Sequence, residues 1–107
     1  MISGLPVTKK ELHALYAKLK RRWFKENPSC CVPGCTWPTQ DLHHVRGRLG
    51  ILLVIVELWR PLCRPHHDKL KQPGGVAWGR SLGLLPPAGG HNTVPPELKE
   101  KYAKQFA

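Results

Sequence analysis

Hydrophobic residues recur at helical spacing in one long segment near the start of the chain. Thr8 and Glu11 match a capping box, which marks a helix start, and Pro28 disfavours helix in the residue before it. Between these signals the apolar positions form a single stripe: Leu12, Leu15, Tyr16, Leu19 and Trp23. The pattern therefore predicts an amphipathic helix over residues 9–26.

Basic residues fill the rest of that helix. Residues 9–26 hold seven Lys or Arg and two Glu. Four of the cations lie off the apolar stripe: Lys18, Arg21, Arg22 and Lys25. Such residues form either a solvated face or a contact with DNA phosphates, and we predict the DNA contact.

The remaining pattern is shorter and more interrupted. It predicts a loop into a strand near 41–45, a buried strand over 51–58, short helices over 63–71 and 76–85, and a terminal helix after Pro95. The apolar run 51–58 is also compatible with a buried helical turn, because eight residues do not separate the two by period. Together these elements indicate a small α+β domain with flanking helices.

Length and charge narrow the function classes. The chain has 107 residues, which suits one domain with a thin core, and its formal charge is +10. This charge favours a polyanionic partner, either nucleic acid or an anionic membrane. The longest aliphatic run, 49–56, is interrupted by Gly50 and is far shorter than the roughly 20 residues of a membrane span. Without a secretory signal pattern either, we expect a cytoplasmic protein with no membrane partner.

Cysteine and histidine residues fall into two clusters with the spacing of a structural zinc site. The first cluster holds Cys30, Cys31 and Cys35, and the second holds Cys63 and His66. Zinc takes four tetrahedral nitrogen or sulfur ligands, which two such pairs supply. Either Cys30 or Cys31 completes the first pair. We predict a zinc site at Cys30, Cys35, Cys63 and His66, with Cys31 as the alternative to Cys30.

Three further histidines lie beside these clusters. His43 and His44 are adjacent on a predicted strand, so their side chains point to opposite faces and do not easily bind one ion together. A division of labour between a metal ligand and a general base is therefore natural. His67 directly follows His66. His13 and His91 are interpreted as ordinary surface histidines.

The order of these residues resembles the HNH endonuclease family. The resemblance rests on the two spaced cysteines, on Asp41-Leu42-His43-His44-Val45, and on Cys63-Arg64-Pro65-His66-His67-Asp68. It covers residues 30–71 and is greatest to small phage and prophage proteins with a zinc knuckle. It implies a ββα-metal domain, preceded by the basic helix at 9–26 and followed by a loop-rich extension at 72–107.

The resemblance also implies roles for individual residues. His44 corresponds to the general base, and His43 and His67 to ligands of a catalytic divalent ion, Mg²⁺ or Mn²⁺. Leu58 stands where the family has an asparagine that orients the loop of the base. Arg46 and Arg48 follow the base and suit phosphate binding. The expected reaction is nicking or double-strand cleavage of DNA that leaves 5′-phosphate and 3′-hydroxyl ends.

Two other readings remain open at this point. A non-catalytic zinc module that binds nucleic acid needs the zinc ligands but not His43, His44 and His67, and Leu58 favours it. The chain could also be a zinc-stabilised adaptor between proteins, for instance in a phage packaging assembly. The charge of +10 argues against this as its sole role. The sequence allows a homodimer without predicting one.

Overall fold

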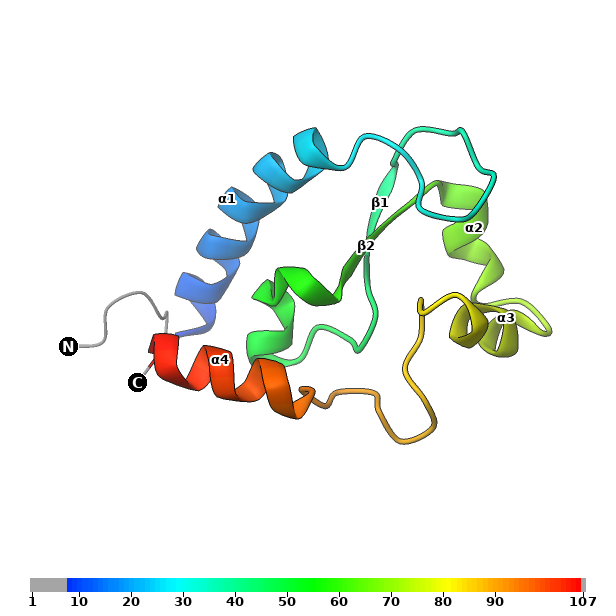
Figure 1. Ribbon diagram of the computed structural model, residues 1–107. Helices are drawn as coiled ribbons and strands as arrows, with labels where there is room; N and C mark the ends of the chain where they lie inside the picture. Colours follow the sequence, from blue (N-terminus) through cyan, green and yellow to red (C-terminus); the bar gives the residue numbers. More distant parts are fainter. Residues whose placement is uncertain (1–7, 107) are drawn as a thin grey trace.

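The computed structural model describes residues 8–106, with side chains for residues 8–102; residues 1–7 and 107 lie outside it (Figure 1). The elements in chain order are α1 (Lys9–Glu26), β1 (Asp41–His44), the 3₁₀ helices η1 (Gly50–Val54) and η2 (Val56–Leu58), β2 (Trp59–Leu62), α2 (Arg64–Lys69), α3 (Gly75–Ser81) and α4 (Pro96–Phe106). The prediction of an α+β chain with flanking helices is confirmed.

The first helix has the bounds that its sequence pattern predicts. The hydroxyl of Thr8 accepts a hydrogen bond from the backbone N–H of Glu11, and the Glu11 carboxylate accepts one from the backbone of Thr8. Tyr16 and Trp23 then pack edge-on against Trp59 of β2, with ring centroids 5.6 Å and 5.8 Å apart. This aromatic contact fixes α1 against the sheet.

The sheet consists of β1 and β2 paired antiparallel. Its register places His43 opposite Arg60 and His44 opposite Trp59. Because successive side chains of a strand point to opposite faces, the two adjacent histidines are directed to different sides of the sheet. Although β1 has only four residues, it carries one histidine on each of its faces.

The prediction of a buried strand over 51–58 is wrong. This segment forms η1 and η2, and the second strand begins after it, at Trp59. Four successive residues, 52–55, are all buried, so the segment has no alternation that would favour a strand. Local bonds from the Leu52 N–H to the Leu49 carbonyl and from the Leu58 N–H to the Ile55 carbonyl satisfy backbone groups within the segment.

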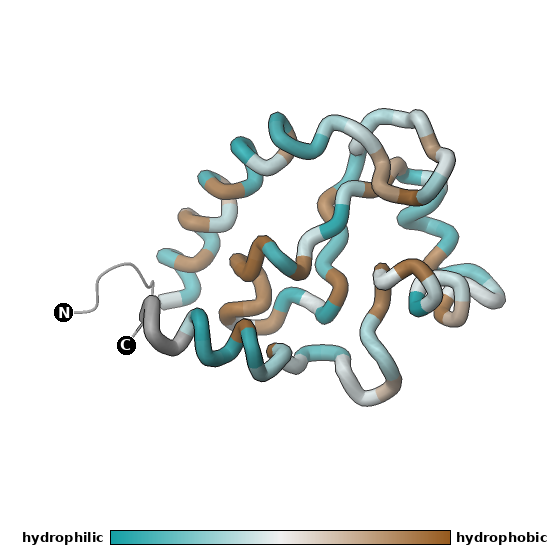
Figure 2. The backbone as a smooth tube through the Cα atoms, viewed as in Figure 1, coloured by the Kyte–Doolittle hydropathy of each residue, from teal (hydrophilic) through white to brown (hydrophobic). Residues whose placement is uncertain are grey.

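Two separate cores pack on the two sides of the sheet (Figures 1 and 2). The cysteine core lies toward α2 and α3 and consists of Cys30, Leu62, Cys63, Leu70 and Leu84. The apolar core lies toward α1 and α4 and consists of Leu52, Ile55 and Leu58, covered by Leu98 and Tyr102. Figure 2 shows the hydrophobic residues of η1 and η2 between these two helices.

The C-terminal helix is tied to the apolar core by a polar contact. Glu57 of η2, next to the core residue Leu58, accepts hydrogen bonds from the Tyr102 hydroxyl at 2.6 Å and from the ammonium group of Lys101. These bonds lower the pKa of Glu57 below its ordinary value, although partial burial acts in the opposite direction. The contact joins residues that are 44 and 45 positions apart.

Other predicted boundaries differ by a few residues. The helix expected at 76–85 is α3, which ends at Ser81 because Gly83 follows with a left-handed φ of 72°. It starts at Gly75, where a side chain would lie 2.2 Å from the Lys69 carbonyl oxygen. Among the described residues, no helix combines the length and the apolar character that crossing a membrane requires.

Candidate metal centre and histidine pocket

The candidate metal centre consists of Cys30, Cys35, Cys63 and His66, whose ligand atoms all lie within 4.8 Å of one another. The Sγ atoms of Cys35 and Cys63 are 4.0 Å apart, and Nδ1 of His66 lies 3.2 Å from Cys63 Sγ and 3.6 Å from Cys30 Sγ. Ideal tetrahedral zinc geometry separates two sulfurs by roughly 3.8 Å, and sulfur from nitrogen by roughly 3.6 Å. These four residues can therefore hold a metal ion, and the donor set is that of structural zinc.

The loop after α1 positions the first pair of ligands. An isolated bridge joins Ser29 and Pro38, and the Cys30 N–H donates to the Trp37 carbonyl at 2.9 Å. Within the loop so closed, a turn through Gly34, with φ of 81°, brings Cys35 back toward Cys30. The turn residues between the cysteines are thus what lets two thiols approach one ion.

The start of α2 positions the second pair. Cys63 caps the helix and His66 lies in its first turn, so their side chains meet three residues apart. Trp78 of α3 covers the His66 ring, with centroids 5.8 Å apart. This packing links α3 to the metal centre.

The structure distinguishes the two neighbouring cysteines. Cys30 is buried within the group of four, whereas Cys31 is exposed and outside it. The Cys31 N–H donates to the Pro61 carbonyl at 2.8 Å, which attaches the loop to β2. Of the two alternatives that the spacing leaves open, the structure selects Cys30.

A second site, the histidine pocket, lies along β1 and the start of α2. It encloses about 410 Å³ and brings together the three histidines singled out from the sequence with one of the two arginines. Its lining includes His43, His44, His67, His91 and Arg48. The rings of His43 and His67 have centroids 5.2 Å apart.

Backbone carbonyls fix two of these rings from opposite sides of the sheet. Nε2 of His43 lies 2.5 Å from the Leu84 carbonyl oxygen, and Nε2 of His44 lies 3.2 Å from that of Leu53. With Nε2 as the donor, Nδ1 of each ring remains an acceptor. Burial lowers the pKa of His43, and it lowers the pKa of His44 to about 4, so that both rings are neutral near pH 7.

A carboxylate fixes the third ring. Nδ1 of His67 donates to Asp41 at 3.0 Å, which leaves Nε2 as an acceptor. Arg64 also binds Asp41, at 3.0 Å, and its hydrogen bond, with a smaller contribution from His67, lowers the pKa of the carboxyl. Sequence reasoning gave Asp41 no role. The signal was available, since Asp41 precedes His43 by two residues and shares its strand face.

The two arginines after β1 have different surroundings. Arg46 donates to the Thr93 hydroxyl at 2.7 Å, and its carbonyl accepts from the Asn92 N–H at 2.8 Å. Arg46 thereby holds the loop that carries His91 against the pocket. His91 is exposed, as expected of a surface histidine, and it also lines the pocket. Arg48 is exposed and lies over the Tyr16 ring, 5.5 Å from its centroid.

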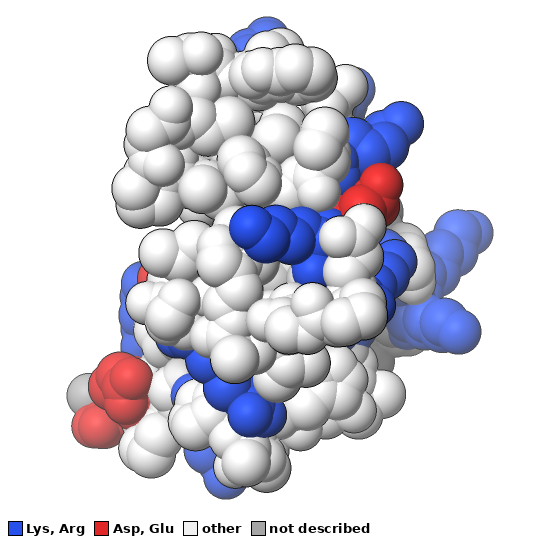
Figure 3. Space-filling view, turned by 90° about the vertical axis from the view of Figure 1, so that its right-hand side faces the viewer, with Lys and Arg blue, Asp and Glu red and all other residues white. Residues whose placement is uncertain are grey.

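The basic residues of α1 remain accessible. Lys18, Arg21, Arg22 and Lys25 are all exposed. Arg22 pairs with Glu26 of the same helix at 3.4 Å, and this ion pair is solvated on both sides. Figure 3 shows the face formed by α2 and α3, where Lys and Arg side chains also outnumber Asp and Glu.

Comparisons of the chain with protein-family models, with curated proteins and with solved structures find no match.

Proposed function

We propose that this chain is a zinc-stabilised, metal-dependent endonuclease of the HNH type that hydrolyses DNA phosphodiester bonds. The observation that carries the proposal is the histidine pocket, in which His43, His44 and His67 each have one ring nitrogen fixed by a protein oxygen. Such anchoring is typical of histidines that act as ligands or bases, because it sets the tautomer and the orientation of the ring. The order β1, β2, α2 around the pocket fits a ββα-metal unit.

His44 is the general base of the proposed reaction. Its Nε2–H donates to Leu53, and its Nδ1 accepts the proton of the attacking water. The low pKa of this buried ring keeps it unprotonated throughout the neutral range, and it also makes the ring a weaker base than an ordinary imidazole. Attack of the water then releases the 3′ oxygen and leaves a 5′-phosphate.

His43 and His67 are the proposed ligands of the catalytic divalent ion. Their available nitrogens are Nδ1 and Nε2 respectively, and Asp41 holds His67 in the manner of an outer-shell carboxylate. A bound divalent ion stabilises the charge that develops on the phosphate and the leaving oxygen. Imidazole donors favour transition ions, so we expect Mn²⁺ to bind better than Mg²⁺.

His44, the proposed base, is oriented even though Leu58 replaces the asparagine of the family. Leu58 is buried in the apolar core, and its backbone carbonyl accepts from the N–H of Val45 at 2.9 Å. That bond fixes the residue directly after His44, while the Leu53 carbonyl fixes the His44 ring. Backbone groups of η1 and η2 thus supply the orientation that an asparagine side chain gives elsewhere.

DNA binding in this proposal draws on the charge of the chain. Four exposed cations of α1 and one of the loop after β1 offer contacts to phosphates along a duplex: Lys18, Arg21, Arg22, Lys25 and Arg48. Such contacts displace counterions, and binding should therefore weaken as salt rises. Reversing the charges at Lys18, Arg21, Arg22 and Lys25 should weaken binding to all sequences alike.

The test is cleavage of supercoiled plasmid with Mn²⁺ by the wild-type chain and by His44→Ala. We expect the variant to lose about 10²–10⁴-fold in rate while keeping its zinc, its circular dichroism and its DNA affinity. His43→Ala and His67→Ala should instead require more Mn²⁺ for half-maximal rate. If His44→Ala cleaves at the wild-type rate in nuclease-free preparations, the endonuclease proposal is wrong. DNA binding without cleavage would then favour the non-catalytic zinc module.

A further inference from the structure

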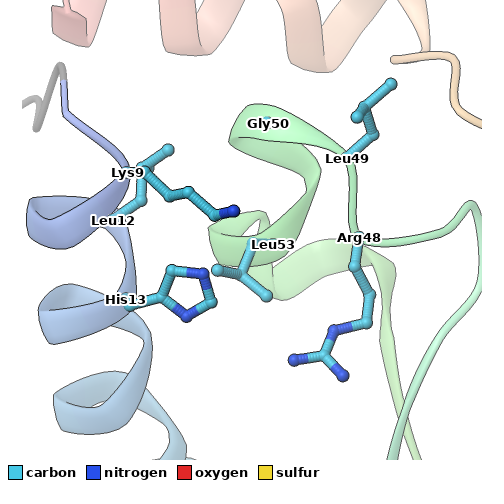
Figure 4. Close-up of a pocket in the computed structure, with 7 residues that line it drawn as sticks. All are labelled: Lys9, Leu12, His13, Arg48, Leu49, Gly50 and Leu53. Carbon is cyan, nitrogen blue, oxygen red and sulfur yellow. The ribbon is translucent and has the colours of Figure 1, made fainter.

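A second cavity, which we call the Lys9 pocket, lies between the start of α1 and the loop into η1 (Figure 4). It encloses about 480 Å³, within the range of small-molecule sites. Helix α1 contributes Lys9, Leu12 and His13, and the other wall consists of residues 48–50 and Leu53. None of these elements is part of the metal centre.

The polar groups of the Lys9 pocket are all nitrogen donors or potential cations. Lys9 and His13 extend from α1 toward the opposite wall, and Arg48 extends from the loop (Figure 4). The residues that line this cavity include no aspartate or glutamate. A site with this charge selects an anion, and guanidinium and ammonium groups suit a phosphate in particular.

The rest of the lining is apolar. Leu12, Leu49 and Leu53 form this surface, and the Leu49 side chain is 66% exposed. A free phosphate ion makes no use of three leucines, because the apolar surface favours a ligand with apolar faces of its own. The combination of cations and leucines indicates a ligand that carries both a phosphate and a ring with apolar faces.

The Lys9 pocket adjoins the histidine pocket at one shared residue. Arg48 lines both, and its position over the Tyr16 ring holds the guanidinium at their junction. Leu53 gives a second link, since it lines the Lys9 pocket and its carbonyl accepts a hydrogen bond from His44, which lines the histidine pocket. A ligand in one cavity therefore lies next to a ligand in the other.

We infer that the Lys9 pocket binds one nucleotide of the DNA strand, adjacent to the phosphodiester that occupies the histidine pocket. Its phosphate contacts Lys9, His13 and Arg48, and its sugar and base pack on the leucines. This inference rests on the proposed function for the identity of the polymer. The binding itself does not require cleavage, and it is measured separately.

The experiment is an NMR titration of the ¹⁵N-labelled, zinc-loaded chain with deoxythymidine 5′-monophosphate. Saturable shifts are expected at the amides of Leu12, His13, Gly50 and Leu53. Inorganic phosphate and deoxythymidine serve as parallel probes, and each should bind at least about tenfold more weakly than the nucleotide, because each makes only part of the contacts. Equal binding of inorganic phosphate would overturn the nucleotide assignment.

Two matched pairs of variants locate the site. Lys9→Gln should weaken nucleotide binding by roughly tenfold at low salt, whereas Lys10→Gln removes the same charge one residue away and should leave it within about twofold. Leu49→Ser should weaken the nucleotide but not inorganic phosphate. Val76→Ser, at another exposed apolar residue, is its control. Equal losses from Lys9→Gln and Lys10→Gln would show that only overall charge matters, and would overturn the inference.

The outcomes separate this inference from the proposed function. Nucleotide binding at these amides without DNA cleavage would support the Lys9 pocket as a nucleotide site and contradict the endonuclease proposal. Cleavage that depends on His44 but is unaffected by Lys9→Gln at limiting DNA would support the endonuclease proposal and contradict the nucleotide site.

Discussion

The cysteine core and the apolar core lie on opposite sides of one small sheet, and they differ in the types of residue that form them. The cysteine core combines three buried leucines with two buried cysteines that belong to the group of candidate metal ligands. The apolar core has three buried aliphatic residues closed by α4 and needs no ligand groups. The adjacent histidines of β1 divide between them, since His43 bonds to Leu84 of the first and His44 to Leu53 beside the second. The proposed site therefore needs both cores at once.

The largest effect is expected from breaking the cysteine core. Cys63→Ala, or removal of zinc by a chelator, should unfold it, because structural zinc contributes apparent binding energies of about 10–16 kcal/mol in small domains. Hydrogen exchange should show loss of protection in α2 and β2 first. Cys31→Ala is the control and should keep one zinc per chain by elemental analysis. A zinc-free chain with unchanged protection would contradict the assignment.

A smaller effect is expected from a cavity in the apolar core. Ile55 is fully buried, and Ile55→Ala should lower the free energy of unfolding by about 2–5 kcal/mol. Chemical denaturation of the zinc-loaded chain measures this loss. Zinc stoichiometry should stay at one, since the two cores share no ligand, and a loss of zinc in folded Ile55→Ala would show that the cores are not separate.

Restoring the family residue should not improve the protein. Leu58→Asn places an amide in the apolar core and should destabilise the chain by about 1–3 kcal/mol, because no partner for that amide is provided. Cleavage per folded molecule should not rise, since backbone groups already orient His44. A gain in rate at saturating Mn²⁺ would instead mean that the base is poorly held in the present sequence.

The smallest effect concerns the contact between η2 and α4. Because the folded-state pKa of Glu57 is lowered, this carboxylate stabilises the fold above its ordinary pKa near 4.5, and the contribution is lost as pH falls through the lower folded value. Glu57→Gln should lower stability by about 1 kcal/mol or less at pH 7, and by less still near pH 3. Thermal unfolding at both pH values measures the difference. Glu97→Gln, which removes another α4 carboxylate, is the control and should change stability at pH 7 by less than about 0.5 kcal/mol.

How far the sequence predicts this molecule differs between the two sides of the sheet. The metal centre and α1 are predicted from short-range sequence signals. The capping box marks the start of α1, and the closely spaced pairs of ligands mark the metal centre. The choice of Cys30 over Cys31 needed the loop closure between Ser29 and Pro38, which spacing alone does not specify.

The apolar side was harder to predict for physical reasons. Residues 51–58 are covered on several sides by α1 and α4, so their hydrophobicity carries no period that separates strand from 3₁₀ helix. The histidine pocket also depends on long-range contacts. The Leu84 carbonyl bonds to His43 from 41 positions along the chain, and His91 lines the pocket from still farther along. No local sequence pattern predicts that a backbone carbonyl is the partner of a histidine.

The bond between His43 and the Leu84 carbonyl has a consequence for the life of the protein in the cell. Leu84 belongs to the cysteine core, so we expect its carbonyl to be in place only once that core has assembled. On the proposed function, a newly synthesised chain that has not acquired zinc lacks an ordered ligand for the catalytic ion and does not cut DNA. Zinc supply would then act as a maturation step that keeps an incomplete nuclease harmless to the cell that makes it.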